Sequence, residues 1–153
     1  MEGFWIKDEK VSVESKKQDR SDGEQKEVIG VDIKKLNKAM ESLKEDLGDA
    51  LIATDIYSVH DGQAIVAYNP QPAANALFNR ITGMMVKSLK ESGFPDLGRY
   101  YQIELVGGKL ITNMVLGDYA WGMLVDTNKA QVGLLNNVII PKLIELFKEA
   151  EKG

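Results

Sequence analysis

Three eight-residue stretches rich in apolar residues, separated by two short glycine-containing turns, form the clearest hydrophobic pattern in the chain. They are residues 99–106, 109–116 and 119–126, with Gly107-Gly108 and Gly117-Asp118 between them. Short apolar stretches bounded by turn residues are typical of β-strands, and two-residue turns of this composition join antiparallel neighbours. The pattern therefore predicts a three-stranded meander.

Two-residue turns would also fix which residues face each other across the strands. On that register one face is almost wholly apolar, with the rows Leu105/Leu110/Val125, Ile103/Thr112/Met123, Tyr101/Met114/Trp121 and Arg99/Leu116/Tyr119. The opposite face carries both polar and apolar residues. A shift of one residue would exchange the two faces of a strand, so the register is a sharp prediction.

Ahead of the meander, the apolar spacing changes to that of an amphipathic helix. The apolar residues that would share one face of this helix, after Asp32, are Ile33, Leu36, Met40, Leu43 and Leu47. Asp32 is suited to cap the first turn, and Gly48 is suited to follow the last. The apolar stripe is narrow, which predicts a helix that packs by one edge.

A second hairpin and a second helix are predicted between this helix and the meander. The hairpin strands are Ala50 to Val59 and Gln63 to Tyr68, joined around an Asp-Gly turn. Two prolines then introduce a helix from Ala73 to Glu91. Its apolar arc is wide, which indicates two neighbours, a sheet and a further partner.

The C-terminal region predicts a long helix. Asn128, with Gln131 three residues later, resembles a capping box. The residues expected to face inward are Val132, Leu135, Ile139, Leu143 and Leu146. Because Pro141 lacks a backbone N–H and clashes with the preceding turn, the helix is expected to kink or restart near Ile140.

Residues 1–27 differ in composition from the rest, which divides the chain into a tail and a domain at 28–153. Thirteen of the residues 7–27 are charged and almost none is apolar, a composition typical of a disordered or weakly helical tail. Phe4-Trp5-Ile6 is an isolated apolar cluster within it. The cluster is either a docking peptide or simply part of a terminus.

Composition narrows the classes of function. The chain of 153 residues contains no cysteine, and its net charge of −4 is divided between tail and domain. Neither part favours binding to nucleic acid. No signal peptide or membrane-spanning run is recognisable, so a cytoplasmic protein without membrane association is expected.

No catalytic motif can be assembled from the sequence. His60 is the only histidine and lies beside a predicted turn, where a polar surface role is the commoner one. Gly107-Gly108-Lys109 lacks the earlier glycine, the Ser/Thr and the helix of a phosphate-binding loop. We therefore expect no catalytic residue, metal site or cofactor, and a protein that is not an enzyme.

The order of the predicted elements resembles that of the roadblock family, named for a dynein light chain. The resemblance covers about residues 30–152 and includes a first strand that ends in Asp-Gly and a last strand that ends in Asp. It also includes the Asn128-x-x-x-x-Gly133-Leu134-Leu135 entry to the last helix. The charged tail, the longer first strand and Pro141 depart from the family pattern.

This resemblance implies a profilin-like α/β fold of three layers, with a five-stranded antiparallel sheet in the order 2-1-5-4-3. It implies a non-catalytic homodimeric adaptor or regulator of a small Ras-like GTPase. The alternative is a small-molecule-sensing domain of related architecture. The dimer interface would use an edge strand and the middle helix, through Leu77, Ile81, Met84, Met85, Tyr100, Gln102 and Glu104.

Overall fold

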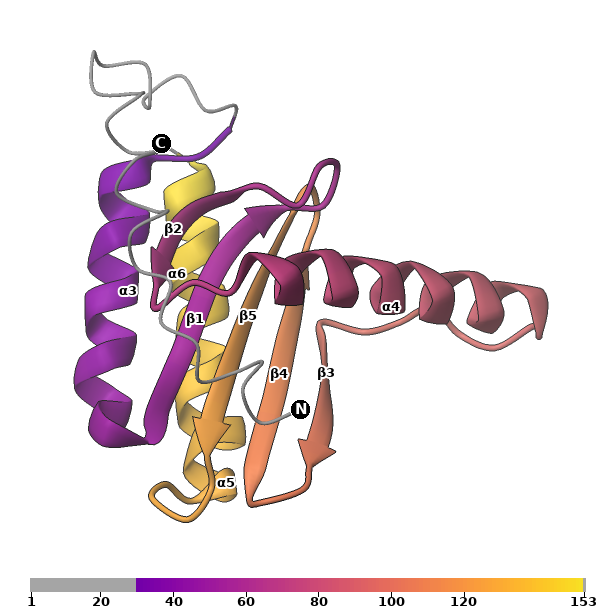
Figure 1. Ribbon diagram of the computed structural model, residues 1–153. Helices are drawn as coiled ribbons and strands as arrows, with labels where there is room; N and C mark the ends of the chain where they lie inside the picture. The colour runs from indigo at the N-terminus through magenta and orange to yellow at the C-terminus, as the bar shows by residue number, and fades with distance from the viewer. Residues whose placement is uncertain (1–29, 153) are drawn as a thin grey trace.

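A computed structural model describes residues 30–152 of the chain (Figure 1). The elements in chain order are α3 (Ile33–Leu47), η2 (Gly48–Ala50), β1 (Leu51–Ser58), β2 (Ala64–Tyr68), α4 (Pro72–Glu91), β3 (Tyr100–Leu105), β4 (Lys109–Leu116), β5 (Tyr119–Asp126), α5 (Val132–Leu134), η3 (Leu135–Ile139) and α6 (Ile140–Glu151). The predicted tail and the Phe4-Trp5-Ile6 cluster lie outside the described residues.

The five strands form one antiparallel sheet in the order β2-β1-β5-β4-β3. Helices α3 and α6 lie side by side on one face, and α4 crosses the other (Figure 1). The predicted α/β fold of three layers and its strand order are therefore confirmed.

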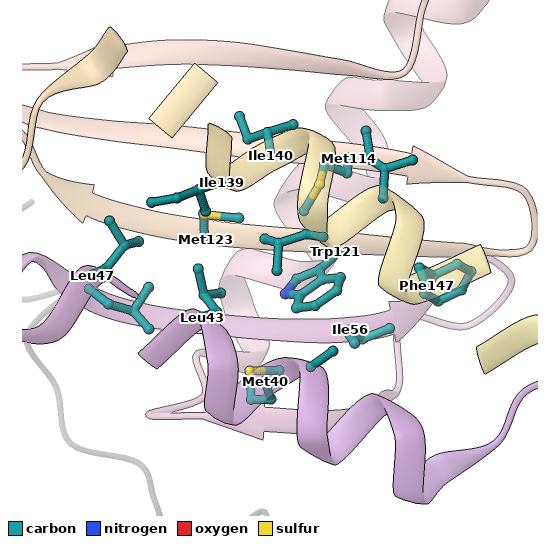
Figure 2. Close-up of a cluster of buried hydrophobic side chains, with 14 of the residues drawn as sticks. Met40, Leu43, Leu47, Ile56, Met114, Trp121, Met123, Ile139, Ile140 and Phe147 are labelled. Carbon is teal, nitrogen blue, oxygen red and sulfur yellow. The ribbon is translucent and has the colours of Figure 1, made fainter. Parts of the chain in front are cut away.

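The larger core lies between the sheet and the α3/α6 pair. Figure 2 shows Trp121 of β5 among side chains of α3, α6 and the neighbouring strands. Trp121 is fully buried, and its indole N–H donates to Thr54 Oγ1 at 2.9 Å. Thr54 Oγ1 in turn donates to the Gly122 carbonyl oxygen at 2.7 Å, so the one buried polar group of the indole is satisfied within the sheet.

Local signals set the ends of α3 as predicted. The Asp32 carboxylate accepts hydrogen bonds from the backbone N–H groups of Lys34 and Lys35, at 3.0 and 3.3 Å. Gly48 ends the helix with a φ of 54°, a left-handed value that favours glycine. The predicted stripe on α3 faces the larger core, where Ile33 is partly buried and the other four positions are buried.

The predicted register between β3 and β4 is wrong by one residue. Leu105 pairs with Lys109, and Ile103 pairs with Ile111, because the connecting loop has three residues rather than two. Val106 belongs to that loop and is fully exposed. Gly107 and Gly108 follow with φ of 96° and 79°, which suits a three-residue hairpin loop that ends in positive φ.

This shift exchanges the two faces of β3. Tyr101, Ile103 and Leu105 face α4 instead of the larger core, and Tyr100, Gln102 and Glu104 lie on the α3/α6 side. The register between β4 and β5, with its two-residue turn, is the predicted one.

The regular α-helical pattern of the last helix is interrupted just before Pro141, as the sequence predicted. A π-helical turn, Leu135–Ile139, precedes α6, which begins at Ile140 with the proline in its first turn. The predicted capping box at Asn128 is wrong, because the helix begins only at Val132 and Gln131 makes no capping hydrogen bond. Val132 is 40% exposed rather than inward.

Candidate functional site: the β3 edge and helix α4

Strand β3 forms one edge of the sheet, and no described strand pairs with its outer side. The Val115 N–H donates to the Arg99 carbonyl oxygen at 2.8 Å, which marks 99/115 as a hydrogen-bonded pair of the ladder. Such pairs alternate along antiparallel strands, so Tyr100, Gln102 and Glu104 direct their backbone N–H and C=O groups away from β4. The edge therefore offers a row of backbone donors and acceptors.

The side chains of these three edge residues have different surroundings. Tyr100 is half-buried against the larger core, and Glu104 is exposed. Gln102 donates from its amide nitrogen to Thr112 Oγ1 at 3.0 Å and to Asn136 Oδ1 at 2.7 Å. The Gln102 side chain thus links the edge strand to the π-helical turn, which the sequence did not indicate.

Helix α4 is supported by the sheet along only part of its length. It crosses the sheet and extends beyond β3 before the chain returns through residues 92–99 (Figure 1). The buried residues of α4 are Ala74, Asn75 and Phe78, all in its first half. The second half projects past the edge strand.

The four α4 residues predicted to form an interface fall into two groups. Leu77 and Ile81 are partly buried and pack against the smaller core on the α4 face of the sheet. Met85 is half-buried, whereas Met84 is 62% exposed. Phe94, in the loop that follows the helix, is 64% exposed. Two exposed apolar side chains, Met84 and Phe94, therefore lie on the second half of α4 and in the loop that leads to the free edge.

A network of hydrogen bonds joins α4 to the sheet. Tyr101 Oη lies 2.8 Å from Thr82 Oγ1 of the helix, and Asn113 Nδ2 donates to Tyr101 Oη at 3.2 Å. Asn113 Oδ1 accepts from the Tyr57 hydroxyl at 3.1 Å. The network runs from β1 to β3 beneath the helix and fixes the position of α4 relative to the edge strand.

A carboxyl group is buried under the first half of α4. Asp55 is 6% exposed and is hydrogen-bonded to Asn75 of the helix. Burial raises the pKa of this carboxyl from its ordinary value of 3.8 to about 7, although the Asn75 hydrogen bond lowers it in part. Burial likewise raises the pKa of the neighbouring Tyr57 hydroxyl, which stays protonated at neutral pH.

A cavity of about 40 Å³ adjoins these groups between α4 and the sheet. Asp55, Tyr57, Asn75 and Asn113 line it together with apolar side chains such as Phe78. A space of this size admits a few water molecules, about one for each 10–15 Å³, and is far below the several hundred Å³ of a typical ligand pocket.

The other candidate catalytic residues, His60 and Lys109, do not lie in a common site. His60 Nε2 lies 3.1 Å from Asp118 Oδ1, and both side chains are mostly exposed at neighbouring hairpin turns. Lys109 directs its ammonium group to the Gly107 carbonyl oxygen at 3.3 Å. Within residues 30–152, no group of three or more acidic or histidine side chains is placed to hold a metal ion. None of the helices in this range is long and apolar enough to cross a bilayer.

Sequence reasoning missed the polar groups beneath α4. Asp55 is the only charged residue of β1, and Asn113 lies among the mainly apolar residues of β4. A charged or amide side chain at an inward position of a strand could have predicted this buried polar network, because such groups are buried only with hydrogen-bonding partners.

Comparison with solved structures places this fold among known ones. MglB from Myxococcus xanthus matches with a TM-score of 0.65 and 15% identity, over 76% of this chain and 87% of that chain. The gliding protein MglB from Thermus thermophilus matches with a TM-score of 0.59 and 12% identity, over 77% and 92%. An MglB structure with a tetrameric arrangement has a TM-score of 0.57 and 14% identity, over 76% and 92%.

No protein-family model and no curated protein matches the sequence. A Roadblock/LC7 domain from Streptomyces avermitilis is also among the matched structures, with a TM-score of 0.47, 13% identity and coverage of 76% and 91%. The chain has the fold and strand order that its resemblance to the roadblock family implied. It has, in particular, the fold of MglB.

Proposed function

We propose that the protein forms a twofold dimer through the outer edge of β3 and the projecting half of α4. The free row of backbone groups on Tyr100, Gln102 and Glu104 is the observation that carries this proposal. Two such edges joined antiparallel would form one continuous sheet of ten strands, twice the five of one chain.

The helix supports the same arrangement. Joining the two edges would bring the projecting halves of the two α4 helices together over the extended sheet, where Met84 and Met85 gain apolar neighbours. An exposed edge strand is otherwise blunted by proline, lysine or a covering segment. Strand β3 contains no proline, and Glu104 is its only charged residue.

The backbone of residue 104 gives a sharp test. Glu104→Pro removes an outward N–H but no hydrogen bond of the β3–β4 ladder, so the monomer should fold. Light scattering should show a dimer for the native chain and for the control Glu104→Ala, which keeps the N–H, and a shift towards monomer for Glu104→Pro. If the native chain is a monomer, the proposed dimer is refuted. If Glu104→Pro leaves the dimer unchanged, the interface does not use the β3 edge.

Substitutions on α4 test the second half of the interface. Met84→Glu places a charge on the exposed apolar face and should weaken the dimer at least tenfold, which corresponds to about 1.4 kcal/mol. Asn37→Glu adds the same charge to the exposed side of α3, on the opposite face of the sheet, and should leave the dimer unchanged. Equal effects of both variants would point to net charge rather than to a contact at Met84.

We further propose that the dimer acts as a non-catalytic adaptor or regulator of a small Ras-like GTPase in the cytoplasm. The likeness of the fold to MglB and the resemblance to the roadblock family support this function. The cavity of about 40 Å³ beneath α4 is too small for a typical ligand, so it does not favour a small-molecule sensor site at that position; an open concavity of about 410 Å³ lies elsewhere, beside the loop before α5. The separated positions of His60, Asp55 and Lys109 do not favour a catalytic function.

The GTPase function is tested by affinity capture from the native lysate with the purified chain as bait, in the presence of GDP or of a non-hydrolysable GTP analogue. A GTPase retained with one nucleotide and lost with the other supports the proposal. Nucleotide hydrolysis by the purified chain alone, abolished by Lys109→Ala, would contradict a non-catalytic function.

A further inference from the structure

The first half of helix α4 covers a titratable group, while Leu77, Ile81 and Thr82 hold the helix on the sheet further along. Ala74, Asn75 and Phe78 are its buried residues, and the Asp55 carboxyl lies beneath them in contact with Asn75. The cavity of about 40 Å³ opens at the same place. We refer to this contact, formed by these four residues and the cavity, as the α4 seat.

The groups around the α4 seat offer Asp55 no positive charge. Of the described residues that line the cavity, Asp55 and Tyr57 alone are ionisable, and Tyr57 is a neutral phenol whose hydroxyl donates to Asn113. The lining residues from the loop before α4 and from β4 are amides or apolar side chains. An ionised Asp55 would therefore be a buried anion stabilised by neutral hydrogen-bond donors such as Asn75, a costly arrangement.

We propose that the protonation state of Asp55 controls how firmly α4 is seated on the sheet. With a neutral carboxyl, the helix closes over the cavity as the structure shows it. Ionisation draws water into the seat and favours its opening, because water solvates the charged carboxyl that the neutral groups of the seat do not. In the dimer proposed above, on which this extension rests, the same step would disturb the helix face offered to the second copy.

The sign of the pH effect follows from linkage. The pKa of Asp55 is raised in the closed seat, so the stabilisation of that state is complete at low pH and is lost as the pH rises from about 4 to about 7. If Asp55 titrates normally once the seat opens, the opening equilibrium should rise about thirtyfold between pH ~5.5 and ~8.5. Above about pH 8 it should level off.

Hydrogen exchange of the full chain measures this opening directly. Protection factors of α4 amides, corrected for the intrinsic rates, should fall about thirtyfold between pH ~5.5 and ~8.5 in the native chain. They should be independent of pH in Asp55→Asn. Asp49→Asn removes a carboxylate from the exposed turn before β1 and should behave as the native chain does. Equal protection at both pH values in the native chain, or the same fall in Asp55→Asn, would overturn the proposal.

Two further measurements separate this proposal from the dimer. Light scattering at both pH values reports the oligomeric state, so a chain that is monomeric throughout would refute the dimer while the exchange of α4 still decides the seat. Should Asp55→Asn fail to fold, the carboxyl carbon of Asp55 in the native chain can be titrated by NMR. A midpoint near that of an ordinary aspartate would overturn the proposal, and one near 7 would support it.

Discussion

At the scale of single residues, the polar groups buried within the sheet have the clearest consequences. Trp121 is fully buried, and its N–H depends on the hydroxyl of Thr54, which is 3% exposed. Thr54→Val keeps the shape but leaves that N–H without an acceptor, so it should lower the free energy of unfolding by about 1–3 kcal/mol in chemical denaturation. Thr54→Ser keeps the hydroxyl and should cost less. The opposite ranking would show that the lost methyl group matters more than the hydrogen bond.

At the scale of elements, the corrected register of β3 determines how the edge strand and α4 are joined. Tyr101 faces the helix and contacts Thr82 and Asn113 through its hydroxyl, whereas Tyr100 packs against the opposite core. Tyr101→Phe should therefore lower the stability by about 1–2 kcal/mol and increase amide exchange in α4, because buried polar groups lose a partner. Tyr100→Phe is the matched control.

The two tyrosine variants also distinguish the registers. With a two-residue turn, Tyr101 would lie on the α3/α6 face, and its hydroxyl could not reach α4. Faster exchange of α4 in Tyr100→Phe with no change in Tyr101→Phe would therefore support the two-residue register against the structure.

At the scale of the whole molecule, the charged tail is expected to be separable from the folded domain. Residues 7–27 offer almost no apolar surface to bury, so deletion of residues 1–27 should change the free energy of unfolding by less than about 1 kcal/mol. Thermal and chemical denaturation of the full and shortened chains would measure the difference. A larger loss would indicate that Phe4-Trp5-Ile6 docks on the domain.

The sequence by itself determined those elements whose signals are local. Asp32 and Gly48 mark the ends of α3 because a cap and a left-handed residue act within one helical turn. Pro141 marks the start of α6 because its missing N–H and its ring act on the preceding turn alone. The two-residue turn at Gly117-Asp118 fixed the β4–β5 register for the same reason.

The tertiary structure decided what depends on contacts distant in the chain. Both β3 registers bury apolar residues, and the sequence around Gly107 permits a loop of two or three residues. The choice depends on what each face of β3 meets, such as Tyr101 beside Thr82. Likewise, the resemblance indicated an edge strand with interface residues. Only the fold shows that Gln102 is bonded to Asn136 and that Asp55 is buried beneath α4, because those partners come from other elements.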